Sequence, residues 1–211
     1  MAPLGLFSGV SPRACPASPA SDLGIIGSVH RRLAVALAVA LGCTVVAALV
    51  PSAGSATDAH NSVRAAALAW AVAQVGAQER GTSNCSPQID GWERDMGLKV
   101  PPCRVWCGAF VHQAFLRAGV KLSARLIDPD RSYEDAVAGR RHLRRIAVSA
   151  IRPGDVIFYK FREGVRASHL AIARSRPQGD RLDTVEGNTS NAVRLETRGT
   201  EYIVLAARVT T

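Results

Sequence analysis

The sequence predicts an α+β fold, in which helices formed by the first part of the chain pack on an antiparallel β-sheet formed by the last part. Apolar residues recur at helical spacing before residue 120, and the period changes to two after residue 152. Gly, Asp and Asn turns separate the alternating segments, as in an antiparallel meander. Helices followed by strands along one chain are typical of the α+β class.

Four segments are expected to be helical. An Ala-rich stretch at residues 61–79 carries apolar side chains at helical spacing. Ser86 followed by a proline predicts the start of a short helix that Gly97 ends. The strongest pattern runs over residues 107–118, with Cys107 in the first turn on the buried side. Ser132 and Asp135 have the spacing of a capping box, which predicts a short helix at residues 132–138.

Five strands are expected in the second half of the chain. The alternating segments lie at residues 156–161, 168–174, 182–186, 192–197 and 201–209. The basic run at residues 140–145 is interpreted as a solvated surface segment, with an anionic polymer as an alternative partner. The sequence lacks an aromatic-rich basic motif of the RNA-binding kind, so nucleic acid is not an expected partner.

Composition and the N-terminal pattern predict an exported globular chain. The 211 residues are 47% hydrophobic and 20% charged, with a formal net charge of +9, as expected for a chain with a buried core. Arg31 and Arg32 precede an uncharged apolar run at residues 33–50, and small residues follow up to Ala56. This pattern predicts a secretory signal cut after Ala56, or an uncleaved membrane anchor at the short end of spanning lengths. Either reading leaves residues 57–211 as one extracytoplasmic domain, secreted or held in the cell envelope, and expected to be monomeric.

Cys107 is the candidate nucleophile. Unpaired backbone N–H groups and the positive end of the helix dipole favour a thiolate in the first turn of a helix. An imidazole that accepts the proton would complete the activation. Among the five histidines, His169 is favoured because it opens a strand. Its expected same-face neighbours, Ala171 and Ala173, are small enough for a helix to pack closely over them.

A catalytic imidazole also needs a group that fixes its orientation. Glu186 and Asn188 lie two residues apart at the end of the next predicted strand. An acidic residue and an amide at this place are candidates to reach the edge of the His169 ring.

Four segments, in order, resemble the motifs of the CHAP family, the cysteine- and histidine-dependent amidohydrolases/peptidases, which are related to the NlpC-type hydrolases. They are WCGAF at residues 106–110, RPGDVIF at 152–158, SHLAIA at 168–173 and VEGN at 185–188. The resemblance covers most of the chain after residue 56. It implies a papain-like α+β fold and cleavage of amide bonds in bacterial peptidoglycan, without a cofactor or metal.

The resemblance also implies roles for single residues. Cys107 would be the nucleophile, His169 the general base and then acid, Glu186 the orienting carboxylate and Asn188 a supporting polar group. The bond cut would be that of an N-acetylmuramoyl-L-alanine amidase, or a stem or cross-bridge amide cut by an endopeptidase. The alternatives are a wall-binding domain without turnover, and a transamidase or protease on the same fold.

The other two cysteines after residue 56, Cys85 and Cys103, are expected to form a disulfide that closes the loop carrying the short helix. An odd number of cysteines in an exported chain then leaves one free thiol. Two alternatives stay open at this point. One is a metal site formed by these cysteines with Cys107 and His112, and the other is a bond between Cys103 and Cys107.

Overall fold

The structure is a computed structural model, and it describes residues 56–211. The predicted signal or anchor at residues 33–50 lies outside the described residues. Within residues 56–211, no helix combines the length and the apolar character that crossing a bilayer requires.

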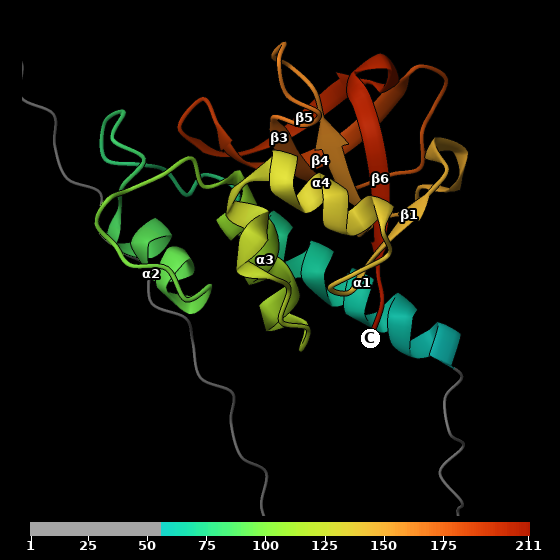
Figure 1. Cartoon of the computed structure of the whole chain (residues 1–211), viewed down its shortest axis with the longest axis horizontal. Helices are drawn as coiled ribbons and strands as arrows, with labels where there is room; N and C mark the ends of the chain where they lie inside the picture. The colour runs from blue at the N-terminus through green and yellow to red at the C-terminus, as the bar shows by residue number, and fades with distance from the viewer. Residues whose placement is uncertain (1–55) are drawn as a thin grey trace, which may run out of the picture. The chain divides into compact units, whose positions relative to one another are not determined.

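The described chain is an α+β fold, as predicted (Figure 1). Its α-helices are α1 (Ala56–Ala73), α2 (Pro87–Asp95), α3 (Cys107–Arg117) and α4 (Pro129–Val137), with short 3₁₀ turns η1 (Ala124–Ile127), η2 (Val148–Ala150) and η3 (Thr200–Tyr202). The strands are β1 (Leu143–Ile146), β2 (Val156–Tyr159), β3 (His169–Ala173), β4 (Arg181–Thr189), β5 (Ala192–Gly199) and β6 (Ile203–Val209). They form one antiparallel sheet in the order β1-β6-β2-β3-β4-β5.

The boundaries of α2 and α3 follow local signals that the sequence analysis identified. The Ser86 side chain accepts a hydrogen bond from the Ile89 N–H at 3.3 Å, and Pro87 occupies the first position of α2. Helix α3 begins at Cys107, as predicted, and the chain turns away at Gly119, which has a positive φ of 86°.

Three predicted helix boundaries are wrong, the first being the start of α1, which lies at Ala56 rather than at residue 61. Helix α1 ends at Ala73 rather than at residue 79, because Gly76 adopts a positive φ of 93° and its N–H bonds the Val193 carbonyl of β5 at 3.0 Å. Helix α4 begins at Pro129, capped by the Asp128 carboxylate, which accepts from two backbone N–H groups. Ser132 therefore lies inside this helix instead of capping it.

Strand β1 was not predicted, because most of it overlaps the basic run at residues 140–145. It pairs with β6 at the edge of the sheet, and only Leu143 of its four residues is buried. A short edge strand with exposed arginines has little apolar pattern to reveal it. Arg140 and Arg141 both contact the buried Asp135 carboxylate, at 3.6 and 3.2 Å, so part of this positive charge is neutralised within the fold.

Helices α1 and α3 lie side by side on one face of the sheet (Figure 1). The strand side chains in their core include Phe158, Leu170 and Ile172. Ala171 and Ala173 belong instead to a smaller core on the opposite face, with Ile157. The prediction that a helix packs over these alanines is therefore wrong. The larger side chains of β3 face the helices because they fill the space between the layers.

The RPGD segment at residues 152–155 connects α1 to the sheet through a cluster of buried ion pairs. The Asp155 carboxylate is fully buried and accepts two hydrogen bonds from Arg208 of β6, at 3.0 and 2.7 Å. Arg64 of α1 lies 3.5 Å from the same carboxylate. Gly154 has a positive φ of 85°, and a Cβ at this position would meet the Arg64 backbone at 2.5 Å. This ion-paired cluster fixes α1 against the sheet that carries His169.

Candidate active site

The Cys107 thiol lies at the N-terminus of α3 and is almost fully buried, with 2% of the residue exposed. No side chain caps this end of the helix, and its first turn contains no acidic residue. The backbone N–H groups of Gly108 and Leu170 are hydrogen-bonding partners of the sulfur. Free helix N–H groups directed at a sulfur favour its anionic form.

Two glycines allow the close packing that places Cys107 against the sheet. A Cβ on Gly108 would clash with the Leu126 carbonyl of η1. A Cβ on Gly187 of β4 would lie 2.5 Å from Phe110 and 2.8 Å from the Trp106 ring. Both contacts are closer than side-chain carbons allow, so only glycine permits this approach of β4 and η1 to the start of α3.

His169 connects Cys107 to Glu186. The imidazole is a hydrogen-bonding partner of the Cys107 sulfur, and its Nε2 lies 3.1 Å from Glu186 Oε2. Since Nε2 faces the carboxylate, Nδ1 is the ring nitrogen left to face the thiol. The structure therefore brings three of the predicted site residues into one continuous row, from nucleophile to base to orienting carboxylate.

Glu186 is fully buried, and polar groups surround its carboxylate. Thr184 donates to Oε1 and Thr189 donates to Oε2, each at 2.8 Å. Arg198 of β5 donates through Nε to Oε1 at 3.1 Å and through Nη2 to Oε2 at 2.8 Å. A buried carboxylate held by this many donors stays charged and keeps a fixed orientation toward His169.

These contacts shift the pKa values in directions that favour an ion pair. Burial alone would raise the pKa of the Cys107 thiol, but the hydrogen bond and charge of His169 outweigh burial and lower it. Burial opposes the charge on His169 as well, yet Cys107 and Glu186 together raise its pKa to about 9. The pKa of Glu186 is strongly lowered, because His169 and Arg198 overcome the cost of burial. At pH values above the lowered pKa of Cys107 and below the raised pKa of His169, the expected state is a thiolate beside an imidazolium.

Asn188 contacts the backbone of the residue before the nucleophile, and His169 is not among its hydrogen-bonding partners. With its amide oriented so that donors meet acceptors, Asn188 donates to Glu79 Oε1 at 3.1 Å and accepts from the Trp106 N–H at 3.0 Å. Glu79 also accepts from the Trp106 indole at 2.9 Å and from the Asn84 N–H at 2.8 Å. This network holds the backbone immediately before Cys107.

Two of these polar residues, Arg198 and Glu79, were not identified from the sequence. Arg198 lies 12 residues after Glu186 on the neighbouring strand, and Glu79 contacts an indole 27 residues away. Arg198 carries a weak signal, because a buried carboxylate in a strand predicts a cation on an adjacent strand. Glu79 shows no comparable signal, since it lies in an irregular segment between helices.

A cavity of about 290 Å³ opens beside the thiol and the imidazole. Its lining consists of Val105, Cys107, Pro129, Phe161, Arg162, Ser168 and His169. The Phe161 ring lies 5.9 Å from the His169 ring and is 42% exposed. The sulfur is therefore buried within the fold but borders a hollow in which a substrate carbonyl can approach it.

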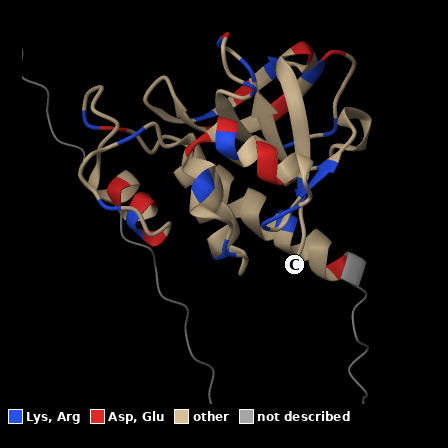
Figure 2. Cartoon of the chain, viewed as in Figure 1, with Lys and Arg blue, Asp and Glu red and all other residues tan. Residues whose placement is uncertain are grey.

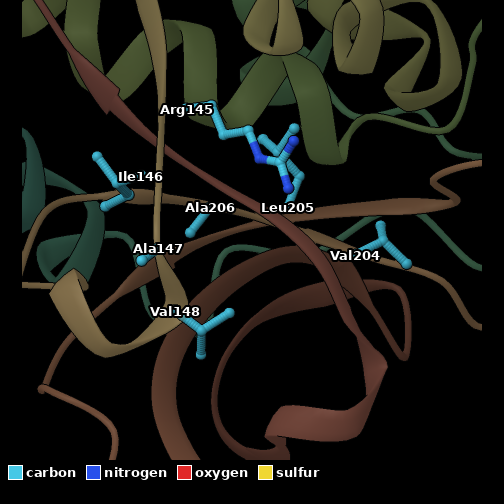
Figure 3. A pocket seen from close by; sticks show the side chains of 7 residues that line it. All are labelled: Arg145, Ile146, Ala147, Val148, Val204, Leu205 and Ala206. Carbon is cyan, nitrogen blue, oxygen red and sulfur yellow. The ribbon is translucent and has the colours of Figure 1, made fainter.

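A second hollow, of about 410 Å³, lies on β1 and β6, away from these groups (Figure 3). Its walls are formed by Arg145, Ile146, Ala147, Val148, Val204, Leu205 and Ala206. It contains no nucleophile, histidine or carboxylate, so it offers none of the groups that amide chemistry requires.

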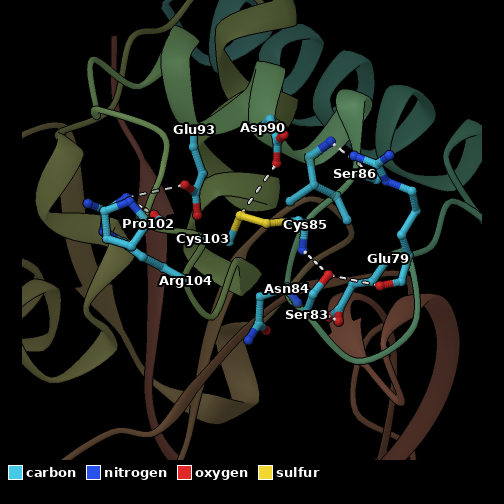
Figure 4. Close-up of a disulfide and its surroundings, with 12 residues drawn as sticks. Glu79, Ser83, Asn84, Cys85, Ser86, Asp90, Glu93, Pro102, Cys103 and Arg104 are labelled. Carbon is cyan, nitrogen blue, oxygen red and sulfur yellow. Dashed lines mark hydrogen bonds and ion pairs between the residues drawn. A yellow bond between two sulfur atoms is a disulfide. The ribbon is translucent and has the colours of Figure 1, made fainter.

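Cys85 and Cys103 form a disulfide, as predicted, with their Cα atoms 5.5 Å apart (Figure 4). It closes the segment that contains α2. Bonded sulfurs offer no thiolate to a metal, which argues against the predicted alternative of a metal site. It also leaves Cys107 as the free thiol of the described residues. His112 is fully buried on α3 and is not part of the row formed by Cys107 and His169.

Comparisons with known proteins find similarity at the level of structure alone. No family model matches the chain, and no curated protein matches it. The P60 domain of an M. avium paratuberculosis antigen is similar, with 15% identity and a TM-score of 0.46, over 74% of this chain and 97% of that one.

Two further solved structures have lower TM-scores. A Staphylococcus aureus subsp. aureus Mu50 protein, described as similar to lipoprotein of the NLP/P60 family, has 15% identity and a TM-score of 0.39, over 73% of this chain and 42% of that one. A mutated form of the Resuscitation Promoting Factor Interacting protein RipA has 19% identity and a TM-score of 0.40, over 73% of this chain and 63% of that one. Likeness at this level bears on neither activity nor substrate, and the resemblance to the CHAP family stays a prediction.

Proposed function

We propose that residues 57–211 form a cysteine hydrolase domain that cleaves amide bonds in bacterial peptidoglycan outside the cytoplasm. The observation that carries this proposal is the row of Cys107, His169 and Glu186 beside a cavity. A thiol at an uncapped helix N-terminus, a basic imidazole and a buried carboxylate are the groups that acyl transfer to sulfur requires.

The reaction follows from the positions of these groups. The Cys107 thiolate attacks the carbonyl carbon, and backbone N–H groups at the start of α3 stabilise the oxyanion. The His169 imidazolium gives its proton to the amine nitrogen, so that the C–N bond breaks and a thioester remains. The neutral imidazole then takes a proton from water, which attacks the thioester and releases a carboxylic acid. The sulfur leaves as thiolate and His169 is again protonated.

The substrate and the location rest on sequence patterns. Peptidoglycan is the substrate class implied by the four motifs that resemble the CHAP family. Export rests on the basic residues and apolar run that end at residue 50. The disulfide between Cys85 and Cys103 agrees with an oxidising compartment, where such bonds persist.

Digestion of purified cell walls tests this proposal. The full chain should release soluble fragments, whereas Cys107→Ala and His169→Asn should release none. His60→Asn is the matched control, because His60 contacts Thr211, outside the site. Mass spectrometry of the fragments separates an amidase, which frees whole stem peptides from muramic acid, from an endopeptidase, which splits stems or cross-bridges.

Other outcomes would contradict the proposal. Binding to walls without fragment release would indicate a silent wall-binding domain. Fragments joined to an added amine in place of water would indicate a transamidase, and cleavage of unrelated proteins but not of walls would indicate a protease.

A further inference from the structure

Arg162 is a cation in the wall of the cavity that contains Cys107 and His169. It belongs to the loop between β2 and β3, and its side chain is exposed. Within residues 56–211, none of the carboxylates forms an ion pair with Arg162. By contrast, the nearby Arg166 and Arg198 each pair with a carboxylate. An arginine without a partner beside a reactive thiol is available to a ligand.

The neighbouring charges are already neutralised within the fold. Arg198 is held by Glu186, and Arg166 pairs with Asp130 at 2.9 Å and with Glu134 at 2.7 Å. Lys160 pairs with Glu163 at 3.1 Å, so the acidic residue next to Arg162 in the loop already has a partner. Elsewhere, α2 and α4 are mainly acidic, and each contains a single arginine (Figure 2). The uncompensated charge on the cavity wall is therefore that of Arg162.

The loop that carries Arg162 is fixed at both ends. The Phe161 N–H donates to Ser168 Oγ at 2.8 Å, and the Lys160 N–H donates to the Tyr202 carbonyl at 3.0 Å. On the other side, the Arg166 backbone N–H donates to Asp130 of α4 at 2.6 Å. Because these bonds restrain the loop backbone, Arg162 stays near the cavity, and binding a ligand orders its side chain but not the whole loop.

The rest of the cavity is apolar. Val105 is 62% exposed and Phe161 is 42% exposed, and they lie in the same lining as Pro129. Such exposed apolar side chains favour a ligand with aliphatic groups. A guanidinium next to them favours a carboxylate, since its planar N–H groups match two carboxylate oxygens.

We propose that Arg162 binds a free carboxylate on the substrate next to the scissile amide, which makes this cavity a subsite for acidic aliphatic peptides. The inference rests on the proposed function, whose reaction takes place at Cys107. The carboxylate belongs to a residue on either the acyl or the amine side of the amide, and the experiment below distinguishes the two.

The probes are a synthetic wall stem peptide and two versions of it. In one version, the carboxylate on the acyl side of the amide proposed to be cleaved is converted to a carboxamide. In the other version, the carboxylate on the amine side of that amide is converted instead. Isothermal titration with the full chain carrying Cys107→Ala measures binding without turnover. The affinity for one of the two carboxamide peptides should fall about tenfold, as expected for the loss of a charge-assisted hydrogen-bonded pair.

Variants at Arg162 complete the test. Adding Arg162→Ala should weaken binding of the unmodified peptide about tenfold and remove the difference between the peptides, whereas Arg162→Lys should keep part of it. Arg176→Ala removes the same charge from an exposed position in the β3–β4 loop and should change nothing. Both arginines are exposed, so these substitutions should leave the melting temperature unchanged.

The inference is wrong if the chain binds all three peptides equally, binds none of them, or loses no affinity on Arg162→Ala. Failure of the proposed function gives a different result. In that case the chain with Cys107 intact would prefer the carboxylate peptide through Arg162 but would release no new amine from it.

Discussion

Arg198 donates two hydrogen bonds to the Glu186 carboxylate, one to Oε1 at 3.1 Å and one at 2.8 Å to Oε2, the oxygen that also contacts His169 Nε2. Glu186 is fully buried, and Arg198 is 28% exposed through its side chain. The arginine thus neutralises a buried charge from the edge of the site. It acts on Cys107 only through Glu186 and His169, which makes it a positioning residue.

Arg198→Met should lower both stability and activity. Removing one partner of a buried carboxylate leaves a poorly compensated charge, and we expect a loss of about 2 kcal/mol, reduced from the cost in a fully buried pair because Arg198 is partly exposed. Urea unfolding measures the loss. Arg198→Lys, which keeps the charge without the fork, should recover part of the stability, and equal stability of Arg198→Met and the unmodified chain would contradict this role.

Glu186→Gln should shift the alkaline side of the pH–rate profile. The imidazolium of His169 is needed as the acid, and its raised pKa of about 9 depends partly on Glu186. Without that negative charge the pKa falls, so activity should be lost at a lower pH. Steady-state rates measured from about pH 5 to about pH 10 cover both an ordinary imidazole pKa and the raised pKa of His169, and they show the shift. An alkaline limb that stays in place would show that Glu186 does not act through His169.

Gly187→Ala should destabilise the domain by about 1 to 3 kcal/mol, because the added Cβ enters the space of Phe110 and Trp106. Activity should fall with it, since the clash moves the start of α3. Gly91→Ala in α2 is the matched control, because its Cβ meets no atom within 4 Å and alanine favours a helix. Thermal unfolding of both variants should show changes of opposite sign, and unfolding at the same temperature would refute the packing argument.

The paired variant Cys85→Ser with Cys103→Ser should lower the free energy of unfolding by about 3 kcal/mol. The disulfide joins residues 18 apart, so its loss frees a loop of that length in the unfolded chain. Cys107 is not part of the bond, and activity at low temperature should persist. Denaturant unfolding of the paired variant and of the unmodified chain under non-reducing conditions measures the change, and identical midpoints would contradict a stabilising role.

Local signals made part of this fold predictable. The start of α2 at Ser86 and the start of α3 at Cys107 depend on capping and periodicity within a few residues. The end of α1 and strand β1 depend on pairing with distant strands, which a local pattern does not report. The facing of β3 was predicted wrongly, because small residues suggested close packing while the larger Leu170 and Ile172 form the helix-facing core.

The residues of the candidate site also separate into those that local sequence patterns predict and those that depend on contacts between distant parts of the chain. Cys107 and His169 were recognisable from their positions at the starts of a helix and a strand, together with the resemblance to known motifs. Asn188 was expected near the imidazole, and the structure places it against Trp106. Arg198 and Glu79 depend on contacts across the fold, so only the structure reveals them.

The central claim is that Cys107 is a thiolate paired with the His169 imidazolium. The most direct test is the rate at which iodoacetamide alkylates Cys107, followed by peptide mass spectrometry. The rate is measured from about pH 4 to about pH 10, which extends roughly two to four pH units to either side of the pKa of a free imidazole. We expect rapid alkylation well below the pKa of an ordinary thiol, about 8.5, and a shift of the profile toward that value in His169→Asn. A Cys107 that reacts only near the ordinary thiol pKa, with the same profile in His169→Asn, would contradict the account.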